Sequence, residues 1–238
     1  MSALYWNTHV INESARHLGG FSLRKWIAVP IIYIMCCAVI PAHAEGPWTA
    51  EIFGGSSYSF PTPLRIRQAG YEDIDITARY ETKPFQKDPY YAWRIGKWNG
   101  DNAWELDFVH QKLYLENKPA EVQEFKITYG YSLLTLNRAW KMHGLIYRFG
   151  LGIVITNSET IVRGMEKTRE GGILNKGYYI SGPTAQGAIG KRFYLGKDLF
   201  LALEGKLTAS YARIDINGGY AQVPNAAVHW LFGLGYDF

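Results

Sequence analysis

Three side chains in the last thirty residues have types that could perform acyl-group chemistry. Ser210 offers a hydroxyl nucleophile, His229 an imidazole base and Asp215 a carboxylate. A hydrolase needs its hydroxyl within hydrogen-bond reach of a base. Residue alternation places Ser210 and His229 on two different strands, whose register the sequence does not fix. We therefore expect His229 to be a buried polar residue with a structural role. Ser210, His229 and Asp215 are the candidate catalytic residues of the alternative, an enzyme.

Other chemistry has little support in the sequence. His110, His143 and His229 are far apart and lack the spacing of metal ligands. The chain has no phosphate-binding loop and no nucleotide motif, so we predict neither a metal nor a cofactor. The formal charge is +4 and there is no basic run, which argues against a nucleic-acid partner.

Four arginines are candidate ligand-binding residues. Arg65 and Arg67 follow a Pro-Thr-Pro step, and Arg163 and Arg169 lie in a segment of mixed charge. Guanidinium groups form strong paired hydrogen bonds with phosphates. A partner that presents phosphate groups would suit these side chains. A solvated surface without a ligand is the alternative, and the sequence identifies no protein partner.

The last eleven residues, 228–238, alternate strictly between two kinds of side chain. One parity is large and apolar, from Val228 to Phe238, and the other is small or polar apart from Leu231. A period of two with one apolar face is typical of a strand between two different environments. About ten residues also suffice to cross a hydrocarbon layer in a tilted barrel. A last strand of this kind that ends on phenylalanine resembles the closing strand of bacterial outer-membrane β-barrels.

Similar alternation recurs along the chain and predicts eight strands. They are expected at residues 73–81, 91–96, 104–108, 124–132, 145–153, 178–195, 199–211 and 228–238. The predicted fold is all-β, a closed antiparallel transmembrane β-barrel over residues 72–238. Residues 48–58 also look extended, so residues 45–71 are either an extra hairpin, which would give ten strands, or a luminal or periplasmic piece. A soluble β-sandwich or lipocalin-like barrel is the structural alternative.

Charged residues of both signs lie on the parity opposite to the apolar one. In a small closed barrel such residues are expected to pair and fill the lumen. The residues concerned are Arg79, Glu105, Asp107, Lys126, Arg148, Glu204 and Lys206.

The lengths of the connections assign the two ends of the barrel. Periplasmic turns are short and outer loops are long in such proteins. Residues 99–102 and 196–198 are predicted periplasmic turns, while 215–225 and 157–177 are predicted outer loops, the latter the longest. Residues 134–143 fit this alternation least well.

The N-terminal segment resembles a secretory signal peptide. A basic Arg24-Lys25 pair precedes an apolar run over residues 26–40, and Ala42-His43-Ala44 follows as a cleavage site. We predict cleavage after Ala44 and export to the bacterial outer membrane, where the expected partners of the chain are outer-membrane lipid and lipopolysaccharide. An N-terminal membrane anchor is the alternative. Both cysteines lie inside this segment, so the mature chain would have none.

The C-terminal hairpin is faintly similar to the end of the lipid A 3-O-deacylase family of barrels. The shared features are Pro224-Asn225 and a final alternating strand closed by phenylalanine. That family has a His-x-Ser pair before the Pro-Asn step, where this chain has Asp215 and Asn217. The resemblance therefore implies the fold without the catalytic pair. We expect a structural or binding role for the outer loops, with a lipid A-modifying hydrolase and a narrow solute channel as alternatives.

Overall fold

The computed structural model describes residues 47–86, 89–167, 171–173 and 175–238, and this part of the chain is all-β. Its strands are β1 (Trp48–Ser59), β2 (Thr62–Gln68), β3 (Ile74–Ala78), β4 (Tyr80–Glu81), β5 (Tyr91–Asn99), β6 (Asn102–Leu115), β7 (Val122–Met142), β8 (Leu145–Thr156), β9 (Glu159–Val162), β10 (Met165–Glu166), β11 (Tyr179–Tyr194), β12 (Leu199–Ile216) and β13 (Gly219–Asp237). The predicted signal peptide lies outside the described residues. Within them, no helix has the length and apolarity needed to span a membrane.

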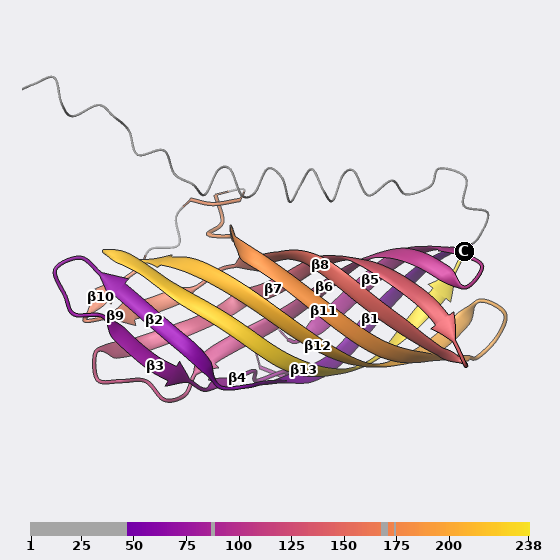
Figure 1. Cartoon of the computed structure of the whole chain (residues 1–238), viewed down its shortest axis with the longest axis horizontal. Helices are drawn as coiled ribbons and strands as arrows, with labels where there is room; N and C mark the ends of the chain where they lie inside the picture. Colours follow the sequence, from indigo (N-terminus) through magenta and orange to yellow (C-terminus); the bar gives the residue numbers. More distant parts are fainter. Residues whose placement is uncertain (1–46, 87–88, 168–170, 174) are drawn as a thin grey trace, which may run out of the picture. The chain divides into compact units, whose positions relative to one another are not determined.

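Eight of these strands form a closed ring (Figure 1). The order is β1, β5, β6, β7, β8, β11, β12 and β13, and every neighbouring pair is antiparallel. The last strand returns to the first over eleven residue pairs, from Thr49↔Asp237 to Ser59↔Ala227. Closure leaves the ring without a free sheet edge. The predicted fold and the count of eight are confirmed, and the alternative of ten strands is wrong.

The first ring strand differs from the prediction. Residues 48–59 form β1, which lies between β13 and β5, so the predicted barrel boundary at residue 72 is wrong. The run Gly54-Gly55-Ser56-Ser57 in the middle of β1 removes the apolar alternation that marks the other strands. Gly55 is required by close packing, because an added Cβ would collide with the carbonyl oxygen of Trp230.

Short turns join the strands at one end of the ring, which we call the turn end. They lie at Gly100–Asp101, His143–Gly144 and residues 195–198. Predicted turns 99–102 and 196–198 are thus found, whereas most of residues 134–143 continues β7. Trp48 and Phe238 also lie at the turn end, where each backbone N–H donates to the other's carbonyl oxygen at 2.7 Å.

The connections at the opposite end, the loop end, are mostly longer. Residues 60–90, 116–121 and 157–178 connect ring strands there. Residues 60–90 are the longest connection, so the prediction that 157–177 is the longest was wrong. Residues 215–225 are not a loop, because β12 and β13 continue to a tight turn at Asn217–Gly218.

The remaining five strands, β2, β3, β4, β9 and β10, are short and extend the barrel beyond the ring at the loop end (Figure 1). β2 pairs with the far end of β13 and with β3, β4 pairs with β6, and β9 pairs with β7 and β10. The predicted strand 73–81 is β3 and β4, interrupted at Arg79, whose backbone N–H donates to Asn117 Oδ1 at 2.7 Å. We call these strands and the adjoining ends of β6, β7, β12 and β13 the cap tier, and the rest of the ring the belt tier.

The polarity of the strands inverts between the two tiers, as β12 shows. In the belt tier its exposed parity is apolar, including Leu203 and Leu207, while Glu204 and Lys206 are buried inside. Beyond Tyr211 the exposed parity carries charge and the buried parity becomes apolar, ending in Ile214 and Ile216.

Neighbouring strands invert in the same way. Inside the cap tier the buried side chains pack into an apolar core made of Leu64, Ile66, Ile74, Ala78, Tyr80, Leu113, Leu115, Phe125, Ile127, Val162, Ile214, Ile216, Ala221 and Val223, among others. Outside the belt tier the exposed large apolar side chains include Ile52, Ile95, Leu106, Phe149, Leu151, Ile189, Leu201, Leu203, Leu207, Trp230, Phe232 and Leu234. The belt tier therefore encloses buried charged side chains, together with apolar ones such as Phe53, Trp98 and Phe200, and is apolar outside. The cap tier is built like a water-soluble domain, with an apolar core and a polar exterior.

Candidate functional site

The lumen of the belt tier holds a buried ionic cluster centred on Arg94 of β5. Its guanidinium nitrogens lie 2.7 Å from carboxylate oxygens of Glu51, Asp107 and Glu204, which come from β1, β6 and β12. These side chains are 1–2% exposed. Burying a charge is costly unless it is paired and hydrogen-bonded, and here each carboxylate has such a partner.

Arg148, Lys206 and Arg192 complete the cluster. Arg148 Nε lies 2.7 Å from Glu105 Oε2, and Lys206 Nζ lies 2.8 Å from Asp107 Oδ1. Arg192 Nε lies 3.0 Å from Glu51 Oε1. The side chains of the cluster come from six of the eight ring strands, β1, β5, β6, β8, β11 and β12, and they meet in the lumen. The lumen is thus filled at this level, which argues against the solute-channel alternative.

His229 faces the lumen, as the alternation predicted. Both of its ring nitrogens have partners, because Nδ1 lies 2.8 Å from the Tyr90 hydroxyl and Nε2 lies 2.9 Å from Thr208 Oγ1. Ser210 Oγ lies 2.7 Å from Thr184 Oγ1. The structure does not bring Ser210 to His229, since the register pairs Ser210 with Asn225 and His229 with Lys206.

Asp215 lies in the cap tier near the end of β12. It is paired in register with Tyr220 of β13, and Asn217 follows in the turn. The positions that correspond to the deacylase pair are therefore at the tip of the hairpin, five or more residues along the strand from Ser210. The geometry provides no contact among Ser210, His229 and Asp215 of the kind that nucleophilic catalysis uses.

The candidate arginines of the cap tier contact their own chain. Arg163 donates from Nη1 to Gln68 Oε1 and from Nη2 to the Glu72 carbonyl oxygen, both at 2.7 Å. Its guanidinium also lies 4.8 Å from the centre of the Tyr71 ring. Arg163 therefore fastens the β9–β10 turn to the β2–β3 turn.

Arg67 and Arg65 of β2 face the exposed side of the cap tier. Arg67 lies 3.1 Å from Asp73 and 3.0 Å from Asp75, and the hydrogen bond with Asp75 raises the pKa of Arg67. Arg65 lies 3.9 Å from Asp75. Arg169 lies outside the described residues.

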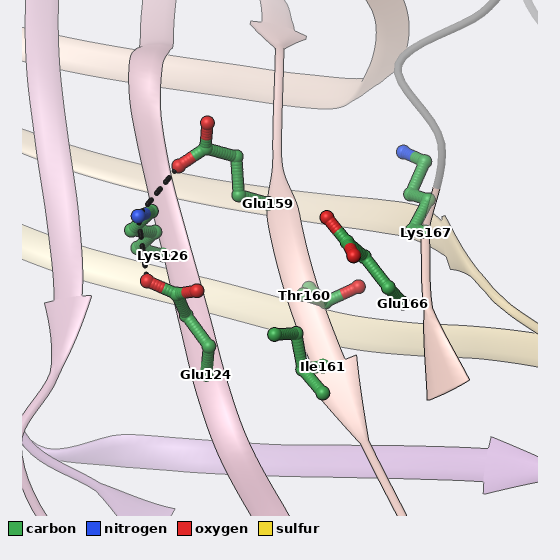
Figure 2. A pocket seen from close by; sticks show the side chains of 7 residues that line it. All are labelled: Glu124, Lys126, Glu159, Thr160, Ile161, Glu166 and Lys167. Atoms are coloured by element: carbon green, nitrogen blue, oxygen red, sulfur yellow. Dashed lines mark ion pairs between the residues drawn. The ribbon is translucent and has the colours of Figure 1, made fainter. Parts of the chain in front are cut away.

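A polar pocket opens on the surface of the cap tier between β7 and β9–β10 (Figure 2). Its volume is about 400 Å³, and its lining residues are Glu124, Lys126, Glu159, Thr160, Ile161, Glu166 and Lys167. Lys126 Nζ pairs with Glu124 at 2.5 Å and with Glu159 at 2.8 Å. Among the described residues, no group of three or more His, Cys, Asp or Glu side chains has the geometry of a metal site. The pocket can receive polar groups through carboxylates and ammonium groups.

Sequence reasoning missed Arg94 at the centre of the ionic cluster and Glu51, through which β1 joins it. Arg94 lies on the charged parity of the predicted strand 91–96, so alternation alone could have found it. Glu51 is not predictable in this way, because the glycines and serines at residues 54–57 hide the alternation of β1. Of the seven charged residues predicted to fill the lumen, five do so, whereas Arg79 and Lys126 belong to the cap tier.

The chain is similar to solved structures of outer-membrane proteins. The attachment invasion locus protein Ail of Yersinia pestis matches at 14% identity with a TM-score of 0.39, over 82% of this chain and 99% of that chain. OprG from Pseudomonas aeruginosa matches at 10% identity with a TM-score of 0.45, over 81% and 96%. AlkL in lipid bilayers matches at 13% identity with a TM-score of 0.44, over 83% and 92%.

No protein-family model and no curated protein matches the chain. At such low identities and TM-scores the likenesses say nothing of what this chain binds or does. The fold itself rests on the strand pairing described above, and the faint deacylase similarity has no support among these matches.

Proposed function

We propose that the protein is an integral outer-membrane β-barrel that displays its cap tier outside the membrane as a binding surface. The observation that carries this proposal is the inversion of polarity along β12 and its neighbours. An apolar exterior suits lipid, and a polar exterior over an apolar core suits water. The inversion after Tyr211 therefore marks where the strand leaves the hydrocarbon layer, with the cap tier beyond it.

The filled lumen and the separation of Ser210 from His229 favour a binding role over a solute channel or a deacylase. A channel needs an open path, whereas Arg94 and its partners cross the lumen. A deacylase needs a nucleophile beside its base, whereas Ser210 and His229 each bond to a different threonine. The cap tier, in contrast, presents an exposed polar surface with a pocket of about 400 Å³.

Lipopolysaccharide is the partner that the proposed location favours. Arg213 of β12, Gln222 of β13 and Arg65 of β2 form one row on the exposed face, two residues beyond Tyr211 along β12. This is the level at which phosphates of the outer leaflet would lie if Tyr211 marks the interface. Guanidinium groups at this level could bind those phosphates.

Thiol labelling of intact cells tests the proposed display. Signal-peptide cleavage after Ala44 would leave a mature chain without cysteine, so single-cysteine variants report one site each. We expect a membrane-impermeant maleimide to label Arg213→Cys, and the matched control Leu207→Cys on the same parity to stay unlabelled. Mass spectrometry of the outer-membrane fraction should show a chain that begins at Glu45. An unlabelled Arg213→Cys in intact cells that reacts after lysis would contradict the display of the cap tier.

A further inference from the structure

Two cations interrupt the apolar exterior of the belt tier near the turn end. Lys97 of β5 and Arg138 of β7 lie on either side of Trp104 of β6, and Trp48 of β1 lies on the far side of Lys97. The register places all four in a single row, Trp48↔Lys97↔Trp104↔Arg138. Each is at least partly exposed on the outward parity of its strand.

The two cations pack on the tryptophans of this row. Lys97 Nζ lies 5.4 Å from the centre of the Trp48 ring, and Arg138 Cζ lies 5.5 Å from the centre of the Trp104 ring. Arg138 Nη1 donates to the Ala103 carbonyl oxygen at 3.3 Å. The four side chains of the row include two cations and no carboxylate.

This arrangement belongs to one side of the barrel. The outward parities of β8, of β12 from Leu199 to Tyr211 and of β13 from Val228 to Tyr236 carry no charged side chain. Lys191 of β11 is a third outward cation, but it lies outside the row and packs over Phe193. An apolar exterior alone does not account for the two neighbouring cations Lys97 and Arg138.

We propose that the row Trp48–Lys97–Trp104–Arg138 binds the headgroup of an anionic phospholipid in the leaflet at the turn end. The inference rests on the proposed membrane location. Strands lie about 4.8 Å apart, so the backbones of Lys97 and Arg138 are about 10 Å apart and both flexible side chains can meet one phosphate. Tryptophan favours the membrane interface, where an anionic headgroup attracts basic side chains.

Lipid retention by the mature protein purified from outer membranes tests this inference. The protein is first reconstituted into phosphatidylcholine vesicles, and urea-resistant insertion is measured. It is then equilibrated with equal amounts of phosphatidylglycerol and phosphatidylcholine in detergent, and the retained lipids are weighed by native mass spectrometry. We expect the wild-type protein to prefer phosphatidylglycerol, and Lys97→Gln/Arg138→Gln to reduce that preference on the order of tenfold.

A charge-matched control distinguishes a specific lipid site at the row from a general effect of net positive charge on lipid binding. Lys191→Gln/Lys197→Gln removes the same charge near the turn end outside the row and should keep the wild-type preference. Lys97→Arg/Arg138→Lys should keep it as well. An unchanged preference in Lys97→Gln/Arg138→Gln, or an equal loss in both double glutamine variants, would overturn the lipid site. Failure of the wild-type protein to insert into vesicles would instead overturn the proposed membrane location.

Discussion

Arg94 holds together the interior of the belt tier. Arg94→Leu would leave the carboxylates of Glu51, Asp107 and Glu204 buried without their shared partner. Loss of one partner of a buried pair costs about 3–5 kcal/mol. We expect a loss of this size in the free energy of unfolding, measured by urea titration in lipid vesicles. The control Arg65→Leu removes a cation from an exposed pair and should change stability by less than about 1 kcal/mol.

Gly235 and Gly205 should respond in opposite ways to the same substitution. A Cβ at Gly235 would collide with the Phe200 ring, which is fully buried in the lumen, whereas Gly205 faces outward with nothing within 4 Å. Gly235→Leu should therefore destabilise the barrel by about 1–3 kcal/mol or more through overpacking. Gly205→Leu should be tolerated, and heat-modified gel mobility of both variants would show the difference. Equal stability of the two variants would mean that the lumen near Phe200 is looser than the structure shows.

At the scale of the element, β13 offers a test of the inverted polarity within one strand. Phe232 is 61% exposed on the apolar face of the belt tier, and Gln222 lies on the same parity in the cap tier. An arginine facing the middle of a bilayer costs about 2–4 kcal/mol. We expect Phe232→Arg to lower the free energy of unfolding in vesicles by this amount and Gln222→Arg to leave it nearly unchanged. A comparable loss in both variants would contradict the boundary.

The same inversion explains which elements the sequence could predict. Strands 145–153 and 228–238 keep one apolar parity along most of their length, so a period of two identifies them. In β12 and β7 the apolar parity switches sides, and alternation breaks at the switch although the strand continues. The sequence pattern therefore predicts a loop at residues 215–225 and gives no clear strand at residues 134–143, although both continue strands in the structure. Bulges at Gln111/Leu113 and Val122/Glu124 shift the parity in β6 and β7 as well.

The candidate site was less predictable than the fold. The facing of His229 follows from alternation along β13, but its contacts with Tyr90 and Thr208 depend on the register between strands. The partners of Arg163 lie more than ninety residues away, and no local pattern indicates them. The pairing of side chains across the lumen depends on how the ring closes and on the register of its strands. Neither can be derived from a single sequence.

At the scale of the whole molecule, the same continuous strands form two tiers with opposite arrangements of polar and apolar side chains. The belt tier places its ionic cluster inside and its apolar side chains outside, and the cap tier does the reverse. The same strands run through both tiers, so movement of the cap tier relative to the belt tier would break continuous hydrogen-bonded ladders. Such continuity between the tiers suits the proposed display of the cap tier.

The depth of β12 in a bilayer tests the two-tier account most directly. Spin labels placed in turn at the outward positions Leu203, Leu207, Arg213 and Asp215 would be measured for collision with oxygen, which concentrates in lipid, and with a nickel chelate, which stays in water. The account predicts that oxygen dominates at Leu203 and Leu207 and that nickel dominates at Arg213 and Asp215, with the change at Tyr211. Oxygen dominance as far as Asp215, or nickel dominance at Leu207, would contradict it.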